Sequence, residues 1–349
     1  MSTMRNNLKL FVNMILQLLL VLLLFTKFVF FRSEDIDFEA DPEMNIGFLY
    51  IENGELQVKH QKEPIPNIYK IVRIRSGLGN QLFMYAFSVV IAKEIGYPVY
   101  LDLSSFEECN MVDDCFESNV TFPNNINIRR FGLKYFNISN HNISDKRIIS
   151  RAEHIADDEE IFNNGVEFYK DGLITFFKGY YEDLGFFDFE KYRSIFVNEF
   201  KLKNKMDPYN DKLLKMIKET NSVSIHIRRT DKKLTGYLSL NYYKDAINYL
   251  MKRVDNPHFF IFSDDIQWTK DNLNIDAPHI YIENDDNHNY CDFELMKNCK
   301  YNIIANSTFS WWAAWLNSFI DKIVIAPKFW GRGQKRDHEG LIPDSFVRF

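Results

Sequence analysis

The sequence predicts an α/β protein with two domains that face a cleft, preceded by an N-terminal transmembrane helix and a stalk. Three observations support this fold class. Strand-length apolar runs alternate with helical stretches from Ile68 onward, which is typical of parallel sheets. The chain has 349 residues, more than one hydrophobic core usually organises. Near the N-terminus, an apolar run of membrane-spanning length is followed by an acidic segment.

The apolar run covers residues 10–31, and its centre, LQLLLVLLLF, carries no charge. About 20 apolar residues suffice to cross a bilayer. Arg5 and Lys9 precede the run, so residues 1–9 should form a cytoplasmic tail and the later residues should lie on the other side. Because no small-x-small cleavage site follows, an uncleaved signal anchor is favoured over a cleaved signal peptide or a buried helix.

Residues 32–66 are acidic and lack hydrophobic periodicity, and we interpret them as the stalk. Sequons at Asn119, Asn137 and Asn142 lie in a polar stretch, which would suit glycosylation of a lumenal surface. The cysteine spacings match no common zinc site, and Cys291 and Cys299 are expected to be free buried thiols. The formal net charge of −6 argues against a nucleic-acid partner.

The first domain is expected over residues 67–215 and begins with a β-α-β unit. Residues 68–74 (IYKIVRI) predict a strand, which runs into the turn RSGLGNQ. The next stretch is apolar nearly all round, so it predicts a buried helix, and Gly96 ends it before a strand at 98–103. Residues 104–170 show few clear elements. The aromatic stretch 174–187 is expected to be a loop and a short helix that face a cleft.

The second domain, over residues 216–349, repeats the alternation, so both domains are expected to be Rossmann-like. Strands are predicted at 222–227, 258–262, 279–282, 301–305 and 323–326, with helices at 241–253, 265–272, 290–298 and 308–317. Ligands of such domains bind beyond the carboxyl ends of the strands. Four polar clusters follow predicted strands: Gly77, Gly79, Asn80 and Gln81; His226, Arg228 and Arg229; Ser263, Asp264 and Asp265; and Asn306, Ser307 and Thr308.

The arginine cluster suggests an anion site. Arg228 can donate a planar fork to a phosphate, or it can pair with Asp231 or Asp264, whereas Arg229 is expected mainly to brace the fold. Helix N-termini at the GNQ turn and at Thr308 can also bind an anion. These parts suggest a bound nucleotide diphosphate. The alternatives are that Asn80, Gln81, Asp264, Asp265, Ser307 and Thr308 cap helices and that His226 is a core histidine.

The aspartates after FIFS have a second possible use, because a carboxylate can accept from the N1–H and exocyclic amine of guanine. No D-x-D motif is placed to hold a metal, since the only candidate, at 35–37, lies in the expected stalk. The tryptophans of STFSWWAAWL are expected in the core behind a helix N-terminus.

Five segments in order, SGLGNQLFMYA, HIRRTDK, FIFSDD, IIANSTFSWWAAWL and APKFW, resemble the α-1,2-fucosyltransferases of glycosyltransferase family 11 over residues 68–330. The resemblance implies a GT-B-like fold, with residues 67–215 on the acceptor side and residues 216–349 binding GDP-fucose. It also implies inverting transfer of L-fucose from GDP-β-L-fucose to the 2-hydroxyl of a galactose-terminated glycan, without a metal or other cofactor. It implies catalytic roles for Arg228 and Asn80. The donor-binding candidates are Gly77, Gly79, Gln81, His226, Arg229, Asp264, Asp265, Asn306, Ser307, Thr308 and Phe309.

Several points stay open. Thr230 and Lys232 stand where many bacterial members have glycine and tyrosine, which leaves the acceptor open, and Asp231 and Glu182 are both candidates for the general base. The alternative functions are another GDP-fucose-dependent linkage or acceptor, or an inactive membrane-anchored glycan-binding protein. With the expected anchor, the resemblance favours a single-pass type II Golgi membrane protein with a lumenal catalytic domain. A bacterial inner-membrane or cytoplasmic protein is the alternative.

Overall fold

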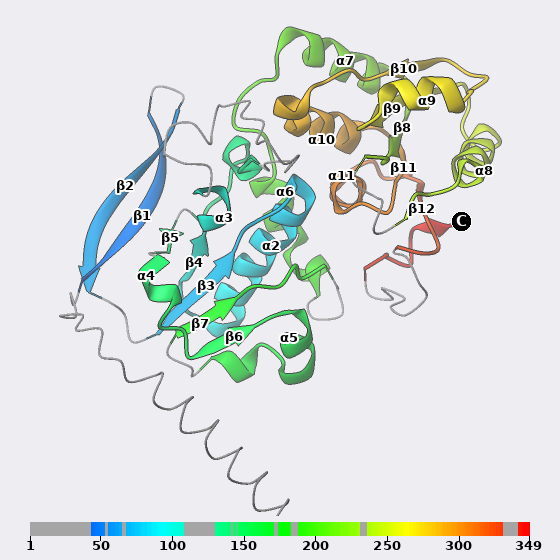
Figure 1. The fold of residues 1–349 in the computed structure, drawn as a ribbon. Helices are drawn as coiled ribbons and strands as arrows, with labels where there is room; N and C mark the ends of the chain where they lie inside the picture. Colours follow the sequence, from blue (N-terminus) through cyan, green and yellow to red (C-terminus); the bar gives the residue numbers. More distant parts are fainter. Residues whose placement is uncertain are drawn as a thin grey trace, which may run out of the picture. The chain divides into compact units, whose positions relative to one another are not determined.

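A computed structural model describes residues 43–52, 55–64, 68–107, 130–140, 142–144, 146–170, 174–182, 188–230, 236–330 and 341–349. Asn45–Phe349 form one compact unit (Figure 1); in the other unit, Met1–Met44, only Glu43 and Met44 are described. The anchor predicted at 10–31 lies outside the described residues, as do Asn119 and the cysteines Cys109 and Cys115. Within the described ranges, no helix combines the length and apolarity needed to span a bilayer.

The first sheet contains the predicted β-α-β unit. β3 is an interior strand that pairs in parallel with β4 on one side and with β7 on the other. β1 adds to the sheet by pairing antiparallel with β5. The strand order is β2-β1-β5-β4-β3-β7-β6. The bounds are β1 Glu43–Glu52, β2 Glu55–Pro64, β3 Tyr69–Arg73, β4 Val99–Asp102, β5 Asn142–Ile143, β6 His154–Ala156 and β7 Ile174–Phe177.

Two sequence expectations for this sheet are corrected. β1 and β2 lie in the stretch interpreted as a stalk without periodicity, yet Ile46, Phe48 and Tyr50 recur at every second position, as strand residues do. Residues 174–177 were expected in a loop but form β7, between β3 and β6. A buried strand four residues long gives no periodicity from which to recognise it.

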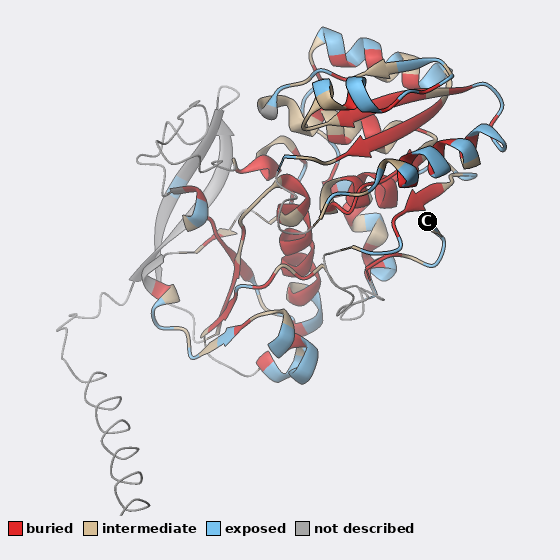
Figure 2. Cartoon of the chain, turned by 45° about the vertical axis from the view of Figure 1, so that its right-hand side comes forward, coloured by how far each residue is buried: buried red, intermediate tan, exposed pale blue. Residues whose placement is uncertain are grey.

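The predicted buried helix is α2, Leu78–Ile95, and it is buried over most of its length (Figure 2). Gly96 ends it in the left-handed conformation, with φ of 76°, and donates its N–H to the carbonyl of Ala92. The remaining helical elements of this half are short: α3 Ser104–Glu107, η1 Gly132–Tyr135, α4 Lys146–Ile149, α5 Asp158–Asn164, η2 Glu167–Tyr169, η4 Phe189–Tyr192 and α6 Arg193–Glu199.

The second sheet confirms the five predicted strands and adds β13. All of its neighbouring strands pair in parallel. Their order is β10-β9-β8-β11-β12-β13, which is the Rossmann order 3-2-1-4-5-6, so the order reverses between β8 and β11. The bounds are β8 Asn221–Ile227, β9 Pro257–Ser263, β10 His279–Tyr281, β11 Tyr301–Ile303, β12 Val324–Ala326 and β13 Val347–Arg348.

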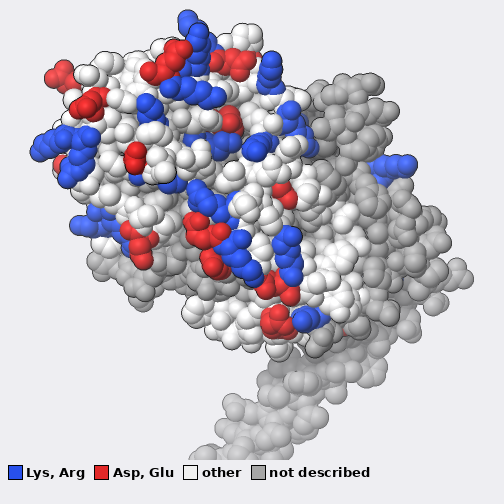
Figure 3. All heavy atoms as spheres, turned by 180° about the vertical axis from the view of Figure 1, so that it is seen from behind, with Lys and Arg blue, Asp and Glu red and all other residues white. Residues whose placement is uncertain are grey.

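The four predicted helices of this half are confirmed as α8, α9, α10 and α11, whereas α7 and η5 were not predicted. Cys291 and Cys299 are free buried thiols as expected. α7 crosses the expected domain boundary between residues 215 and 216, and that boundary stays a prediction. On the face seen in Figure 3, the basic and acidic side chains of the described residues are interspersed. The bounds are α7 Pro208–Glu219, α8 Leu240–Met251, α9 Ile266–Asn272, η5 Asp286–His288, α10 Asn289–Asn298 and α11 Thr308–Leu316.

An aromatic core joins α2 to α11. The ring centroid of Phe83 lies 4.8 Å from that of Trp311 and 4.9 Å from that of Trp312. Phe196 and Phe200 also contact Trp312, with centroids 5.9 and 5.3 Å away. These rings are all fully buried, which confirms that the tryptophans belong to the core. This packing fixes the axis of α11 against that of α2.

Candidate active site

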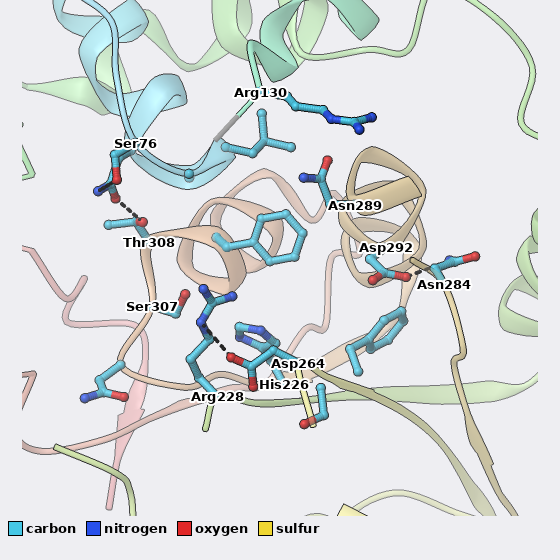
Figure 4. Close-up of a pocket in the computed structure, with 18 of the residues that line it drawn as sticks. Ser76, Arg130, His226, Arg228, Asp264, Asn284, Asn289, Asp292, Ser307 and Thr308 are labelled. Carbon is cyan, nitrogen blue, oxygen red and sulfur yellow. Dashed lines mark hydrogen bonds and ion pairs between the residues drawn. The ribbon is translucent and has the colours of Figure 1, made fainter. Parts of the chain in front are cut away.

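A pocket of about 680 Å³ lies where the polar residues after β3, β8, β9 and β11 converge (Figure 4). It is placed as expected, because the carboxyl ends of parallel strands at an order reversal leave a crevice. Tyr180 and Glu182, which follow β7, also line the pocket. Of the predicted site residues, Gly77, Gly79, Asn80, His226, Arg228, Asp264, Asn306, Ser307, Thr308 and Phe309 line the pocket, whereas Gln81, Arg229 and Asp265 do not.

The turn between β3 and α2 presents an uncapped helix N-terminus to this pocket. Gly77 is the N-cap residue of α2, and the helix start has no side-chain capping hydrogen bond. Ser76 has a φ of 68°, a strained value for a residue other than glycine. The side chain of Asn80 donates from Nδ2 to the Ser76 hydroxyl, at 3.2 Å. The turn therefore holds Asn80 at the pocket edge.

The N-terminus of α11 meets that of α2 at Gly79. A Cβ atom on Gly79 would lie 2.3 Å from the backbone nitrogen of Phe309 and 2.5 Å from the carbonyl carbon of Thr308, so only glycine fits. The Thr308 hydroxyl donates to Oδ1 of Asn80 at 2.5 Å. Gly79, predicted to contact the donor, thus has a packing reason to be glycine. Its role in donor binding stays a prediction.

The start of α11 is also uncapped, because the N-cap residue Ser307 makes no side-chain capping hydrogen bond. His226 lies behind it, only 4% exposed, with Nδ1 2.8 Å from the Ser310 hydroxyl. The Ser310 hydroxyl also lies 3.3 Å from the carbonyl oxygen of Ser307, so it connects His226 to the first turn of α11. The ring of Phe309 lies beside His226, with centroids 5.7 Å apart.

Two cations hold the other end of α11. Lys322 donates from Nζ to the carbonyls of Ala314, Trp315 and Asn317, at 3.1, 3.2 and 2.7 Å. Arg193 donates to the carbonyl of Trp315 as well. Burial, and then the nearby charge of Arg193, lowers the pKa of Lys322 to about 8. Positive groups at a helix C-terminus complement its dipole, so α11 is anchored where it leaves the pocket.

Arg228 forms an ion pair with Asp264, with 3.2 Å between Nε and Oδ2, while Figure 4 shows its terminal nitrogens pointing into the pocket. Asp264 also accepts from the N–H groups of Arg229 and Thr230, at 2.7 and 3.1 Å, and from the Thr230 hydroxyl at 2.6 Å. Four internal donors therefore occupy this carboxylate. The geometry favours the structural alternative for Asp264 over the guanine contact expected from the sequence.

Gln81 points away from the pocket and braces the neighbouring loop. It is fully buried and donates from Nε2 to the carbonyls of Ser76 and Arg130, at 2.8 and 2.7 Å. Its Oε1 accepts from the N–H of Gly132 at 2.8 Å. The expected donor contact at Gln81 is therefore corrected, because all three bonds connect parts of the chain itself.

Arg229 and Asp265 also lie outside the pocket lining. The guanidinium carbon of Arg229 lies 4.2 Å from the ring centroid of Tyr237 and 3.7 Å from that of Trp268, so Arg229 braces the fold through aromatic rings. Asp265 is the N-cap residue of α9 and accepts from the N–H of Trp268 at 3.0 Å. For Arg229 this agrees with the bracing role favoured from the sequence. For Asp265, the capping alternative replaces the predicted donor contact.

The far side of the pocket is lined by polar residues that were not predicted from the sequence. Asn284 donates to Oδ1 of Asp292 at 2.7 Å, which orients this carboxylate. Asp285 and Asn289 lie beside them, and Arg130 bonds to Asn287. Asn284 and Asp285 follow β10, so the strand-end rule points to them as well. In the sequence, the polar run 285–288 is typical of a solvated turn, so these residues are not recognised as part of a binding site.

Asp285, on the same side of the pocket, has a lowered pKa. Burial alone would raise the pKa of Asp285, but His288, 2.6 Å away through Nδ1, and nearby backbone N–H groups bring it below its ordinary value. Asp285 is therefore a carboxylate at neutral pH. Among the described residues, no group of three or more histidine, cysteine or acidic side chains could hold a metal ion. Independence from metals stays a prediction.

The structure describes only some of the residues predicted as general base or as glycosylation sites. Glu182 lines the pocket, whereas Asp231 and Lys232 lie outside the described residues. Asn137 is exposed, and Asn142 lies in β5, paired with Phe48 of β1. Glycosylation of either residue stays a prediction.

The model of the family described as glycosyl transferase family 11 matches residues 69–340. The chain belongs to this family. It is thus a glycosyltransferase, as the sequence motifs implied. An α-1,2-colitosyltransferase of Escherichia coli is 32% identical over 307 residues, which cover 80% of this chain and 98% of that protein. The O-antigen biosynthesis glycosyltransferase WbnK of Escherichia coli is 31% identical, over 78% of this chain and 98% of its own length.

Other similarities are shorter or more distant. Galactoside α-(1,2)-fucosyltransferase 1 of Leontocebus fuscicollis is 27% identical over 105 residues, 27% of this chain and 28% of that protein. Among solved structures, the α-1,6-fucosyltransferase NodZ soaked with GDP-fucose has a TM-score of 0.48 and 17% identity, covering 72% of this glycosyltransferase and 92% of NodZ.

The expected Golgi location is wrong. The two relatives that match 80% and 78% of this glycosyltransferase are proteins of Escherichia coli, a bacterium without a Golgi apparatus. The expectation depended on an anchor followed by a lumenal domain, a pattern that an apolar N-terminal run does not by itself establish.

Proposed function

We propose that this family 11 enzyme transfers L-fucose from GDP-β-L-fucose to the 2-hydroxyl of a galactose-terminated glycan, with inversion, in a GT-B-like arrangement of its two sheets. One observation carries the proposal: the uncapped N-termini of α2 and α11 and the side chain of Arg228 meet at one pocket. Each N-terminus offers unpaired backbone N–H groups and a partial positive charge. A diphosphate would place negative charge next to both helix N-termini and the terminal nitrogens of Arg228.

The same groups would act on the leaving GDP. Negative charge grows on the diphosphate as the bond from C1 of fucose to the phosphate oxygen breaks. Backbone N–H groups and Arg228, fixed in advance, stabilise that charge without a metal. The ion pair with Asp264 holds Arg228 from the Nε side, so its terminal nitrogens keep one orientation in the pocket. This positioning is the main contribution we assign to Asp264.

We assign the guanine to the far side of the pocket, near Asp292. Asn284 orients this carboxylate, and a carboxylate can accept from both N1–H and the exocyclic amine of guanine. The pocket volume of about 680 Å³ fits a nucleotide sugar between the two sides. A comparison of inhibition by GDP and by ADP tests the assignment, since adenine offers no donors in that pattern.

Inversion requires the acceptor oxygen to attack C1 from the face opposite the diphosphate. The new C1–O bond forms as the C1–phosphate bond breaks, GDP leaves with the electron pair, and the hydroxyl proton passes to a base. Glu182 lines the pocket and is the candidate among the described residues. Glu182→Gln should lower kcat and leave GDP affinity unchanged; wild-type turnover in this variant would remove Glu182 from the role.

Colitose is a second candidate for the transferred sugar, because an α-1,2-colitosyltransferase is 32% identical over 80% of this chain. Colitose is fucose without the 3-hydroxyl. A site that hydrogen-bonds this hydroxyl discriminates strongly against the deoxy sugar, whereas a site that leaves it unbound discriminates little. The ratio of kcat/KM for GDP-fucose and GDP-colitose therefore decides between the two donors.

Arg228→Ala provides the test of the diphosphate site. Hydrogen bonds to charged groups contribute about 1.5–3 kcal/mol, so GDP affinity should fall by roughly 10- to 100-fold. The fold should persist, because Asp264 keeps three other donors. Arg253→Ala is the matched control, since Arg253 is exposed and stacks on Tyr249 outside the pocket.

The measurements are calorimetric titration with GDP, and GDP release from GDP-fucose with a β-galactoside acceptor in the presence of EDTA. Linkage analysis of the product by NMR identifies the hydroxyl that accepts the sugar. Full activity of Arg228→Ala would refute the diphosphate assignment, and a product with another linkage would replace the 2-hydroxyl.

A further inference from the structure

A second pocket, of about 540 Å³, adjoins the first on the half that contains the second sheet. It is lined by the start of α8, by the segment that follows β12, and by Phe349 after β13. None of the catalytic or donor-binding groups discussed above lines it except Asn306, which lines both pockets. Asn306 therefore marks where the two cavities meet.

Asn306 and the segment after β12 separate the pockets. The Asn306 side chain is only 3% exposed, and its Nδ2 lies 3.2 Å from each of the carbonyl oxygens of Gly236 and Trp330. Trp330 lines the first pocket, whereas its neighbour Phe329 lines the second. Two successive residues of one segment thus line different pockets. A ligand that crosses this wall would contact Trp330 on one side and Phe329 on the other.

Hydrogen bonds hold the wall segment in place. Lys328 donates its N–H to the carbonyl of Phe349 at 2.7 Å, and Phe349 donates to the carbonyl of Ala326 at 3.0 Å. The ladder between β12 and β13 therefore continues to the residue next to Phe329. A pocket whose backbone is fixed in this way is largely formed before a ligand arrives.

The lining combines exposed rings with exposed polar side chains. Tyr237 is 39% exposed and Phe329 is 57% exposed, although both are large hydrophobic residues. Asn241 and Asp245 are four residues apart on α8, so their side chains lie on one face of the helix. Aromatic faces pack against the C–H faces of pyranose rings, while amide and carboxylate groups bond to hydroxyls. Lys328, which is exposed, also lines the pocket, so its charged side chains have both signs. This combination of rings and polar groups fits a saccharide better than a purely apolar ligand.

We propose that the second pocket binds the pyranose residues of the acceptor glycan that follow its terminal, accepting sugar. The inference rests on the proposed function for its assumption that the acceptor is a glycan. The first pocket has to hold the donor and the accepting sugar, so the rest of a longer glycan must leave it. Because Asn306 lines both pockets, a glycan that leaves the first pocket and passes over this wall enters the second cavity, which is lined with rings.

The proposal predicts an effect of acceptor length that one residue controls. The probes are methyl β-D-galactopyranoside and lacto-N-tetraose, a tetrasaccharide that ends in β-galactose. Phe329→Ala should raise KM for the tetrasaccharide about tenfold, a loss of roughly 1.4 kcal/mol. KM for the monosaccharide, kcat and GDP affinity should stay unchanged. Phe162→Ala is the matched control, because Phe162 is 71% exposed and lines neither pocket.

A direct binding measurement distinguishes failure of this inference from failure of the proposed function. Ligand-observed NMR with lacto-N-tetraose and GDP should show saturation transfer in the wild type and weaker transfer in Phe329→Ala and Asp245→Asn. Equal binding by the wild type and both variants, including no binding by any of them, overturns the second pocket as a saccharide site. Failure of the wild-type enzyme to bind GDP overturns the proposed function instead.

Discussion

Replacing Gly79 by alanine tests the packing of α2 against α11 most directly. The added Cβ would lie 2.3 Å from the Phe309 nitrogen and 2.5 Å from the Thr308 carbonyl carbon, both backbone atoms that no rotamer change can move. Ordinary contact begins at 3.4 Å, so the two helix starts must separate by about 1 Å. The hydrogen bond from Thr308 to Asn80, 2.5 Å long, spans this junction and should lengthen or break.

The magnitude follows from this displacement. Overpacking of this kind costs about 1–3 kcal/mol, which corresponds to a fall in Tm on the order of 5 °C for a chain of this size. A shift of about 1 Å in groups that hold the reacting atoms can reduce turnover by roughly 100-fold. The assay combines thermal denaturation of the ligand-free enzyme, calorimetric titration with GDP, and the rate of GDP release with acceptor.

Gly77→Ala is the matched control in the same turn. Gly77 has φ of −71°, and a Cβ there would meet no atom of the protein within 4 Å, so the Tm of the ligand-free enzyme should stay near that of the wild type. Equal Tm and GDP affinity in Gly79→Ala and the wild type would refute the reasoning, because the junction between α2 and α11 would then have space for a methyl group.

Two further variants separate bracing from binding. Gln81→Ala should lower the free energy of unfolding by about 2–4 kcal/mol, because it leaves two buried carbonyls and one N–H without their partner; weaker GDP binding at wild-type stability would contradict this bracing role. Asp292→Asn should reduce the preference for GDP over ADP by more than about tenfold in inhibition assays, and an unchanged preference would remove Asp292 from guanine recognition.

The sequence predicted most of the second sheet because β8 and β9 are apolar runs of seven residues, and the shorter strands β10, β11 and β12 alternate with helices that have clear starts. It also predicted most of the pocket lining, since the carboxyl ends of parallel strands share one edge and the residues that follow each strand are fixed locally. His226, Arg228 and Thr308 reach the pocket for this reason. The short strands β5, β6, β7 and β13 have between two and four residues, too few for any periodicity to show.

The errors within the site have a different origin. Whether a polar side chain faces the pocket or its own chain depends on distant partners. Gln81 bonds to Arg130 and Gly132, 49 and 51 residues away, and Asp264 is occupied by groups 34 and 35 residues away. Neither partnership leaves a local pattern. Asn284 follows β10, so its place at the pocket could have been predicted in the same way. The polar, acidic run that follows it is typical of a solvated turn, and for that reason it was not predicted.

The aromatic core between α2 and α11 limits how members of this family can be recombined. Phe83 and Phe196 come from the first domain expected from the sequence, residues 67–215, yet the rings they touch, Trp311 and Trp312, come from the last sixth of the chain. A chimera that exchanges only the second sheet with a relative would join surfaces that never evolved together. Natural exchange of the two halves as modules should therefore be rare, and substitutions in α2 should require matching substitutions in α11.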